Sequence, residues 1–437
     1  MSKFFIVSGS HDPYPKANAV CAKSIENALK NQGHEVIYVV TRNNITQSNI
    51  ELINGNKVYF IPKAINDVHW SFSKMNDSFF VFSFEKLILK ITHLFVKVTF
   101  RVLSFFRRKT SRDSAMDSYK HNFVEVMTKL LLHEKPDCVL SFSVPFTSHL
   151  FTYQSFLNSN YRPIWNCFLL DAHAQRAGIS TKQKQLFELE ETIIFNNADK
   201  CFLLNTLKEG YSKNYLKVIA DRFNYFRLPF LKIPLKISVE NNVGINKLKD
   251  TIDITFAGTL YDESRPIEYF CLFIKAAKGT KIRFHLMGKF YPKTLITLQK
   301  LKEFMPEQIF LYGFKTREFV LASLKSSDIL INIGNNNSNQ IPSKILEYIG
   351  FQKPIYSFIR DEKDAALEYL NLYKLSFVIN ENKDTPISEI FDHALAFYNN
   401  CKSEQLNITD LRNSFRGYLE EDVTSEIVQI IESQLDE

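Results

Sequence analysis

The feature that most constrains this chain is a repeated alternation of short apolar strands with helical segments. Residues 4–9 are predicted to form a strand, and residues 19–32 have the apolar spacing of a helix, with Gly33 placed as its C-terminal cap. The alternation continues with predicted strands at 35–41, 137–143, 163–171 and 200–205 and predicted helices at 121–135 and 187–198. Strands that alternate with helices predict an α/β protein with a mostly parallel, doubly wound sheet.

The pattern weakens between Phe223 and Lys249, where two prolines and a polar stretch interrupt it. It then restarts with predicted strands at 253–260, 281–288, 308–313, 328–334 and 353–358. We therefore predict two Rossmann-like domains, residues 1–235 and 236–437, that face each other across a cleft. The chain has a helical pattern from Thr409 onward, and we expect its last helix to return to the N-terminal domain.

Composition excludes several classes of protein. Hydrophobic residues make up 45% and charged residues 23% of the chain, which rules out wholesale disorder. There are only 13 glycines, and the GxGxxG, P-loop, GxSxG and HExxH motifs are absent, so NAD-dependent chemistry is disfavoured. The six cysteines are scattered singly, which predicts reduced thiols in a cytosolic protein without a zinc site.

The positive charge of the chain is concentrated in one segment. Residues 86–112 contain eight basic and no acidic residues; removing these eight from the 54 basic residues leaves 46, against 47 acidic ones. Binding of nucleic acid across a broad face is therefore not expected. The eight are Lys86, Lys90, Lys97, Arg101, Arg107, Arg108, Lys109 and Arg112.

The same region, about residues 79–109, has the pattern of an amphipathic helix. Basic side chains from Lys86 to Arg101 recur every three or four residues, and bulky apolar residues occupy the opposite face. Charged residues within the segment make it a poor membrane span. It suits a helix that lies in the interface of an anionic membrane, although a core helix with a solvated lysine stripe has the same pattern. We expect peripheral attachment to the cytoplasmic face of the cell membrane.

Residues 339–358 contain the first candidate ligand site. Pro342 suits the start of a helix, which would follow the strand at 328–334. Free N–H groups at such a helix start favour an anion, so Ser343 and Lys344 could contact a diphosphate. Glu347, one turn later, could accept hydrogen bonds from ribose hydroxyls. The alternative is that Ser343 only caps the helix, Lys344 is solvated and Glu347 balances the helix dipole.

Two further sets of residues follow predicted strands. One strand ends at Gly258 and leads into a loop with Arg265, whose planar guanidinium suits a diphosphate. In the first half, His149 follows one strand, and Asp171 and His173 follow the next. A carboxylate and an imidazole at the carboxyl edge of a sheet could position an acceptor hydroxyl or take up its proton. Surface or structural roles are the alternatives for both sets.

The segment PSKILEYIG at 342–350 resembles the nucleotide-sugar glycosyltransferases of the GT-B fold, in particular the family 4 type of bacterial polysaccharide and capsule assembly. The resemblance covers most of the chain and is strongest from Ile254 to Phe358. FAGTLYDESRP resembles the donor-phosphate loop of that family, and FLLDAHAQ resembles an acceptor-side strand end. The segment 311–334, which includes Gly313, resembles the part that packs around the nucleotide base.

The resemblance implies a metal-independent, retaining transferase that uses a UDP-sugar or GDP-sugar and no cofactor. Arg265 and Lys344 would neutralise the donor diphosphate, and Glu347 would bind the ribose. Asp171 and His173 would lie near the transferred sugar and the acceptor, which would be a glycan linked to a lipid.

The chain departs from the family pattern in two places. Asn339 stands where the family often has a first glutamate, and Lys16, Ala17 and Asn18 stand where many members have paired glycines. Asn339 can still bind a sugar hydroxyl but supplies no charge. A non-catalytic subunit of this fold and a nucleotide-sugar epimerase of similar architecture therefore stay open as alternatives.

Overall fold

The structure is a computed structural model, and it describes most of the chain. The described residues are 1–9, 17–42, 49–53, 55–61, 114–143, 145–175, 179–214, 219, 221–235, 243–262, 265–336, 341–382 and 384–436. The predicted basic amphipathic segment at 79–109 and the candidate residue Asn339 both lie outside these ranges.

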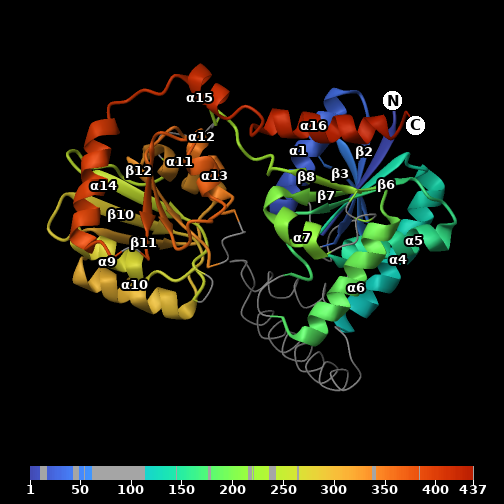
Figure 1. Ribbon diagram of the computed structural model, residues 1–437, viewed down its shortest axis with the longest axis horizontal. Coiled ribbons are helices and arrows are strands. Elements are labelled where there is room, and N and C mark those ends of the chain that lie inside the picture. Colours follow the sequence, from blue (N-terminus) through green and yellow to red (C-terminus); the bar gives the residue numbers. More distant parts are fainter. Residues whose placement is uncertain are drawn as a thin grey trace, which may run out of the picture. The chain divides into compact units, whose positions relative to one another are not determined.

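The chain divides into two compact units. The first unit comprises Met1–Arg227 together with Thr424–Glu437, and the second comprises Leu228–Val423. Figure 1 shows both units, each with a sheet flanked by helices. The last helix, α16 (Glu420–Ser433), begins in the second unit and belongs to the first unit from Thr424 onward.

The first unit contains an eight-stranded sheet with the order β3-β4-β2-β1-β5-β6-β7-β8. All neighbouring strands are parallel except the edge hairpin of β3 and β4. The strands are β1 (Lys3–Ser8), β2 (Glu35–Thr41), β3 (Ile50–Ile53), β4 (Asn56–Ile61), β5 (Cys138–Phe142), β6 (Ile164–Leu169), β7 (Lys200–Leu204) and β8 (Phe223–Phe226).

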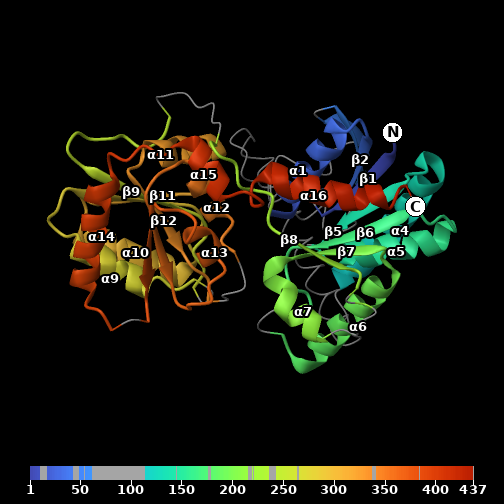
Figure 2. The same ribbon diagram turned by 45° about the horizontal axis from the view of Figure 1, so that its top comes forward.

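Helices connect these strands and cover both faces of the sheet. In Figures 1 and 2, α16 runs beside α1, and α4, α5 and α6 lie together away from it. Glu432 of α16 pairs with His34 at 2.9 Å, which ties the C-terminal helix to the turn after α1. The helices are α1 (Ala17–Asn31), α4 (Ser114–Glu134), α5 (Thr147–Ser159), α6 (Thr181–Asn197) and α7 (Lys208–Asn214), with a 3-10 turn at Asn205–Leu207.

The second unit contains a six-stranded, all-parallel sheet with the order β11-β10-β9-β12-β13-β14. Its strands are β9 (Ile252–Ala257), β10 (Ile282–Met287), β11 (Ile309–Gly313), β12 (Ile329–Ile333), β13 (Ile355–Ile359) and β14 (Ser376–Asn380). Apart from the edge hairpin of β3 and β4, the strand order reverses between β1 and β5 in the first sheet and between β9 and β12 in the second. Ligands of doubly wound folds bind outside the carboxyl ends of the strands at such a switch point.

One face of the second sheet carries an apolar core. Alternate side chains of its strands, among them Ile254 and Phe256, form an apolar core with α9, α10 and α14. Figure 2 shows α9 and α10 on one side of this sheet and α11 on the other. The helices are α9 (Glu268–Ala276), α10 (Pro292–Phe304), α11 (Arg317–Ser326), α12 (Lys344–Gly350), α13 (Leu367–Leu370), α14 (Ile387–Cys401) and α15 (Ile408–Ser414).

The predicted α/β architecture of two doubly wound sheets is confirmed. The alternation of strands and helices did not predict the antiparallel hairpin of β3 and β4, although the two residues between these strands read Asn-Gly, a strong hairpin signal. Within the described ranges, no helix is both long and apolar enough to cross a membrane.

Candidate functional site

Three strands of the second sheet end side by side in glycine. The N–H of Gly258, after β9, donates to the carbonyl of Met287, and the N–H of Gly288, after β10, donates to the carbonyl of Gly313, at the end of β11. A Cβ on Gly288 would lie 1.7 Å from the carbonyl oxygen of Gly258, and Gly288 has a φ of +136°. Only glycine fits this close approach, because a side chain at position 288 would clash with the carbonyl of Gly258. The glycine therefore permits the backbone conformation at this edge of the sheet.

The loop after β9 carries Arg265. Its Nε and Nη2 donate to Oδ1 of Asn335 at 2.9 and 2.6 Å, and its Nη1 donates to the carbonyl of Thr259 at 3.1 Å. All of these acceptors are uncharged, and among the described residues no carboxylate lies within ion-pair distance of this guanidinium. Burial lowers the pKa of Arg265, but an arginine stays charged at physiological pH.

Arg360, at the end of β13, is held differently. Its Nε lies 2.7 Å from a carboxylate oxygen of Glu381, so its charge is balanced. Its Nη2 also donates to the carbonyl of Pro266, the neighbour of Arg265. The two guanidinium groups are thus close enough that Arg360 contributes to the lowered pKa of Arg265. Of the two, only Arg360 forms an ion pair with a described carboxylate, whereas Asp364 interacts with Arg265 from beyond ion-pair distance.

Helix α12 brings Lys344 and Glu347 together. Nζ of Lys344 lies 2.8 Å from Oε2 of Glu347, and Nη2 of Arg317 lies 2.6 Å from Oε1 of the same carboxylate. Burial raises the pKa of Glu347, but the two cations outweigh this effect and hold the pKa below its ordinary value. Glu347 is therefore an ionised acceptor between two cations. Arg317 begins α11, where the Thr316 side chain accepts from the N–H of Phe319.

Tyr348 connects α12 to the strand that precedes Arg265. Its buried hydroxyl lies 3.2 Å from the nitrogen and 3.3 Å from the carbonyl oxygen of Ala257 at the end of β9. The same tyrosine interacts electrostatically with Arg265, Arg317 and Glu347. Tyr348 thus lies in the same region as Arg265, Arg317 and Glu347. No hydrogen bond or ion pair among the described residues joins Arg265 directly to Lys344.

Pro342 and Ser343 precede α12, which begins at Lys344 and has seven residues. The carbonyl of Pro342 accepts a hydrogen bond from the N–H of Ile345 at 2.9 Å. Ser343 is exposed, and its side chain makes no capping hydrogen bond. The alternative role of Ser343 as a side-chain cap is therefore excluded by this geometry.

In the first unit, His173 follows β6 and is packed between aromatic rings. Its ring lies 3.9 Å, centroid to centroid, from Phe146 in a parallel stack and 4.2 Å from Phe187. Its Nε2 lies 2.9 Å from Oε2 of Glu190 on α6. These contacts fix the plane of the imidazole and leave one nitrogen paired with a carboxylate. Asp171, two residues earlier, is exposed.

The backbone of this loop is held by a buried carboxylate. Oε1 of Glu191 accepts from the N–H of Ala174 at 3.0 Å and from the Tyr211 hydroxyl. The Tyr211 oxygen in turn accepts from the N–H of His173 at 3.2 Å. Both glutamates come from α6, whose start is fixed by a capping box of Ser180 and Gln183.

His149 is placed differently from Asp171 and His173. Its ring is fully buried, and Nδ1 lies 2.7 Å from Oγ of Ser141, which also accepts from Nε1 of Trp165. Burial, together with the nearby His173, lowers the pKa of His149 to about 3. His149 belongs to α5, and its enclosed imidazole packs against β5 through Ser141.

Four residues near these candidates were not found from the sequence. Gly288 ends one predicted strand and Asn335 follows another, and this position is the signal that could have found them. Arg317 begins a helix, and Glu190 lies within one, where charged residues are common and carry no signal of their own.

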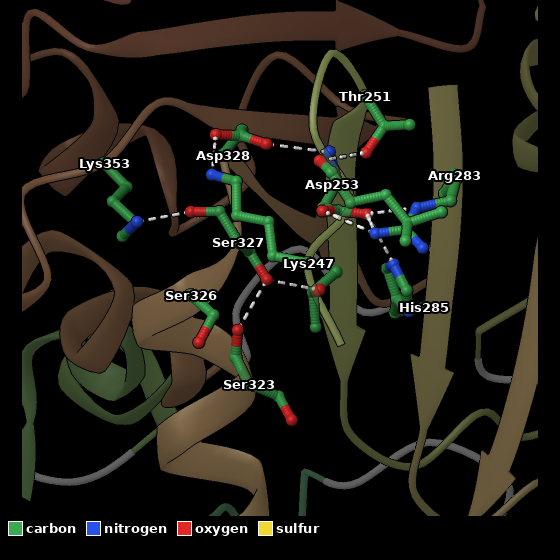
Figure 3. Close-up of polar contacts among 12 residues, drawn as sticks. Lys247, Thr251, Asp253, Arg283, His285, Ser323, Ser326, Ser327, Asp328 and Lys353 are labelled. Carbon is green, nitrogen blue, oxygen red and sulfur yellow. Dashed lines mark hydrogen bonds and ion pairs between the residues drawn. The ribbon is translucent and has the colours of Figure 1, made fainter. Parts of the chain in front are cut away.

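A second polar cluster lies near the amino ends of the strands of the second sheet (Figure 3). Asp253 is buried beside Arg283, with ion-pair distances from 2.7 Å, and its Oδ1 lies 2.8 Å from Nε2 of His285. Nearby, Lys247 pairs with Asp328 at 2.7 Å. These groups satisfy one another at the edge opposite to Gly258 and Asn335, so they stabilise the sheet. In the part of the chain that the structure describes, no three His, Cys, Asp or Glu side chains form a metal site.

No protein-family model and no curated protein matches the sequence. Solved structures do match its fold. The sucrose-phosphate synthase of Thermosynechococcus elongatus aligns over 100% of both chains with a TM-score of 0.65 and 10% identity. Anabaena HepE in complex with UDP-glucose aligns over 99% of this chain and 100% of its own, with a TM-score of 0.58 and 8% identity.

The UDP-GlcNAc 2-epimerase of Methanocaldococcus jannaschii also aligns, over 99% of each chain, with a TM-score of 0.53 and 11% identity. Similarity at this level of identity concerns the fold alone. Together with the two doubly wound sheets, it shows that the chain has the GT-B fold.

Proposed function

We propose that this chain is a glycosyltransferase that moves a sugar from a nucleoside diphosphate sugar to a hydroxyl group of a glycan. The observation that carries the proposal is Arg265. It is a guanidinium with uncharged partners in the described structure, and it lies at the switch point of the second sheet. A donor diphosphate would supply the missing negative charge. The occurrence of UDP-glucose in HepE, which has the same fold, supports this choice of ligand.

The other residues of the second unit suit the rest of such a donor. Lys344 is partly exposed, and its ammonium could turn from Glu347 toward a phosphate oxygen. Glu347 stays ionised between Lys344 and Arg317, so its oxygens can accept hydrogen bonds from ribose hydroxyls. Asn339 would contact the transferred sugar. The glycines at 258 and 313 would allow close approach of the nucleotide to the backbone.

The reaction replaces one bond at the anomeric carbon by another. The bond to the diphosphate oxygen breaks, the acceptor oxygen forms the new bond, and its proton passes to the departing diphosphate. Arg265 and Lys344 would stabilise the charge that develops on the leaving group, which is the role of a metal ion in other transferases. Retention of anomeric configuration is the stereochemistry that the family resemblance favours.

Asp171 and His173 would serve the sugar and the acceptor. Glu190 and the aromatic stack hold the His173 ring in one orientation, as positioning of a reacting hydroxyl requires. The basic segment at 86–112 supports an acceptor that is linked to a lipid, because a protein with this charge pattern would meet an anionic membrane. The site would then work at the cytoplasmic face of the cell membrane.

A nucleotide-sugar epimerase is the second candidate, favoured by the similar fold of the archaeal epimerase. One experiment separates the candidates: the chain is incubated with UDP-sugars and GDP-sugars without acceptor, and the products are separated. Slow hydrolysis of one donor supports the transferase, and inversion at C2 of a UDP-sugar supports the epimerase. Binding of nucleotide sugars without turnover, with or without glycan acceptors, would instead indicate a non-catalytic subunit.

A further inference from the structure

Asn335 has an unusual relationship to Arg265. One amide oxygen accepts from both Nε and Nη2 of the guanidinium, in the position that a carboxylate occupies in most bidentate arginine pairs. The Asn335 side chain is nearly buried, at 8% exposure. It therefore orients the guanidinium as a carboxylate would, but it does not cancel the charge.

The neighbouring Arg360 is paired with a carboxylate instead of an amide. Glu381 pairs with two of its nitrogens, at 2.7 and 3.0 Å. The adjacent asparagine, Asn336, contacts this second arginine, with its Oδ1 3.3 Å from Nη1. Two consecutive asparagines thus touch two arginines, of which only Arg360 forms an ion pair with a described carboxylate.

The backbone that carries Asn335 is fixed. The N–H of Gly334 donates to the carbonyl of Phe358 at 2.8 Å, and a Cβ on Gly334 would lie 2.8 Å from Oδ2 of Asp364. This close packing holds the turn after β12 against β13. Because β12 is the hydrogen-bonded neighbour of β9, the turn faces the loop that carries Arg265.

We propose that Asn335 is a positioning residue that holds the Arg265 guanidinium in place for the donor diphosphate without forming an ion pair with it. The proposal rests on the donor role of Arg265 proposed above. An aspartate at position 335 would hold the guanidinium at least as firmly, but it would place a negative charge where the diphosphate needs a positive one.

The test compares Asn335→Asp with Asn335→Ala in the full chain. Dissociation constants for UDP, GDP and ADP are measured by calorimetry, and thermal midpoints by scanning fluorimetry. We expect N335D to bind the preferred nucleotide at least tenfold more weakly than wild type, with an unchanged or higher thermal midpoint. We expect N335A to bind three- to tenfold more weakly, with a lower midpoint. A merely structural role would make the aspartate the better tolerated change in both measurements.

Asn336→Asp is the matched control, since it adds the same charge one residue away, beside the arginine that Glu381 already balances. We expect N336D to bind within threefold of wild type. An equal loss in N336D and N335D would show a general effect of charge and overturn the proposal. Binding by N335D within twofold of wild type would overturn it as well.

A double-mutant cycle with Arg265→Gln tests whether Asn335 acts through Arg265, and it does not rely on N335D. If Asn335 acts through Arg265, the loss caused by N335A should shrink to less than twofold in the R265Q background. An undiminished loss there would contradict the proposal. Failure of the donor role itself is distinguishable, because wild type would then bind none of the three nucleotides.

Discussion

Nε2 of His173 lies 2.9 Å from Oε2 of Glu190, and the imidazole ring is stacked on Phe146. The two residues are separated by 17 positions, and α6 carries Glu190 back to the loop after β6. A loop residue is thereby oriented by a helix residue, and this support is independent of any ligand.

We expect Glu190→Ala to lower turnover at least tenfold while it changes the affinity for nucleoside diphosphates less than twofold. The reason is that Glu190 orients His173 in the first unit, while the proposed diphosphate ligands belong to the second. Steady-state kinetics and calorimetry measure the two effects. Glu188→Ala, on the same helix, is the control. Equal losses of turnover and affinity would contradict the proposed role.

Lys344→Ala should weaken the binding of nucleoside diphosphates about tenfold, because a charge-assisted contact is worth roughly 1.5–3 kcal/mol. The fold should persist, since Glu347 keeps its pair with Arg317 at 2.6 Å. Calorimetry gives the affinity, and circular dichroism checks the fold. Lys325→Ala, an exposed lysine at the end of α11, is the matched control. Unchanged affinity in K344A would remove Lys344 from the site.

Gly288→Ala should destabilise the protein far more than Gly279→Ala. Both glycines have positive φ, +136° and +79°, but only a Cβ on Gly288 meets the backbone of Gly258. We expect a loss of about 1 kcal/mol in the free energy of unfolding for G279A and about 3 kcal/mol or more for G288A. Urea unfolding followed by fluorescence measures both values. Equal losses would show that the positive φ alone requires glycine at position 288, and not the close approach of a Cβ to the backbone of Gly258.

Asp253→Asn should lower the free energy of unfolding by about 3–5 kcal/mol at pH 7, because it leaves Arg283 without its buried partner. Burial raises the pKa of Asp253, but His285 and Arg283 outweigh it and lower the pKa below its ordinary value. Because the pKa of Asp253 is depressed in the folded state, its ionised carboxylate stabilises the fold fully above about pH 4, the pKa in the unfolded chain. This stabilisation is lost as the pH falls through the folded-state pKa.

The difference between wild type and D253N should therefore shrink below about pH 4. Urea unfolding at pH 7 and at pH 3 tests this, with the exposed Asp392→Asn as control. A difference that grows in acid would contradict the assignment of a depressed pKa to Asp253.

The fifth prediction concerns the basic segment and rests on the sequence. Changing Lys90, Lys97 and Arg101 to glutamate should abolish flotation of the chain with liposomes that contain anionic lipid. Binding by the unchanged chain should rise with anionic lipid and fall with salt. Retained nucleotide affinity in the triple variant would show an intact fold. Undiminished flotation would refute membrane attachment through this segment.

The sequence by itself determined the class of fold. Apolar runs such as residues 35–41 and 329–333 recur between helical segments, and this local periodicity is enough to specify strands, helices and their alternation. Glycines and polar residues that follow the strands also marked Gly258, Arg265 and Asp171 as candidates, because the loops after parallel strands share one edge of the sheet.

The tertiary structure decided which of these residues meet. Arg265 and Asn335 are 70 positions apart, and they touch because β9 pairs with β12, an order set by long-range packing of strands and helices. The same packing enclosed His149 and placed Arg317 beside Glu347. Local periodicity predicts which segments become strands, whereas the order of the strands, and with it the partners of each charge, depends on contacts between residues far apart in the chain.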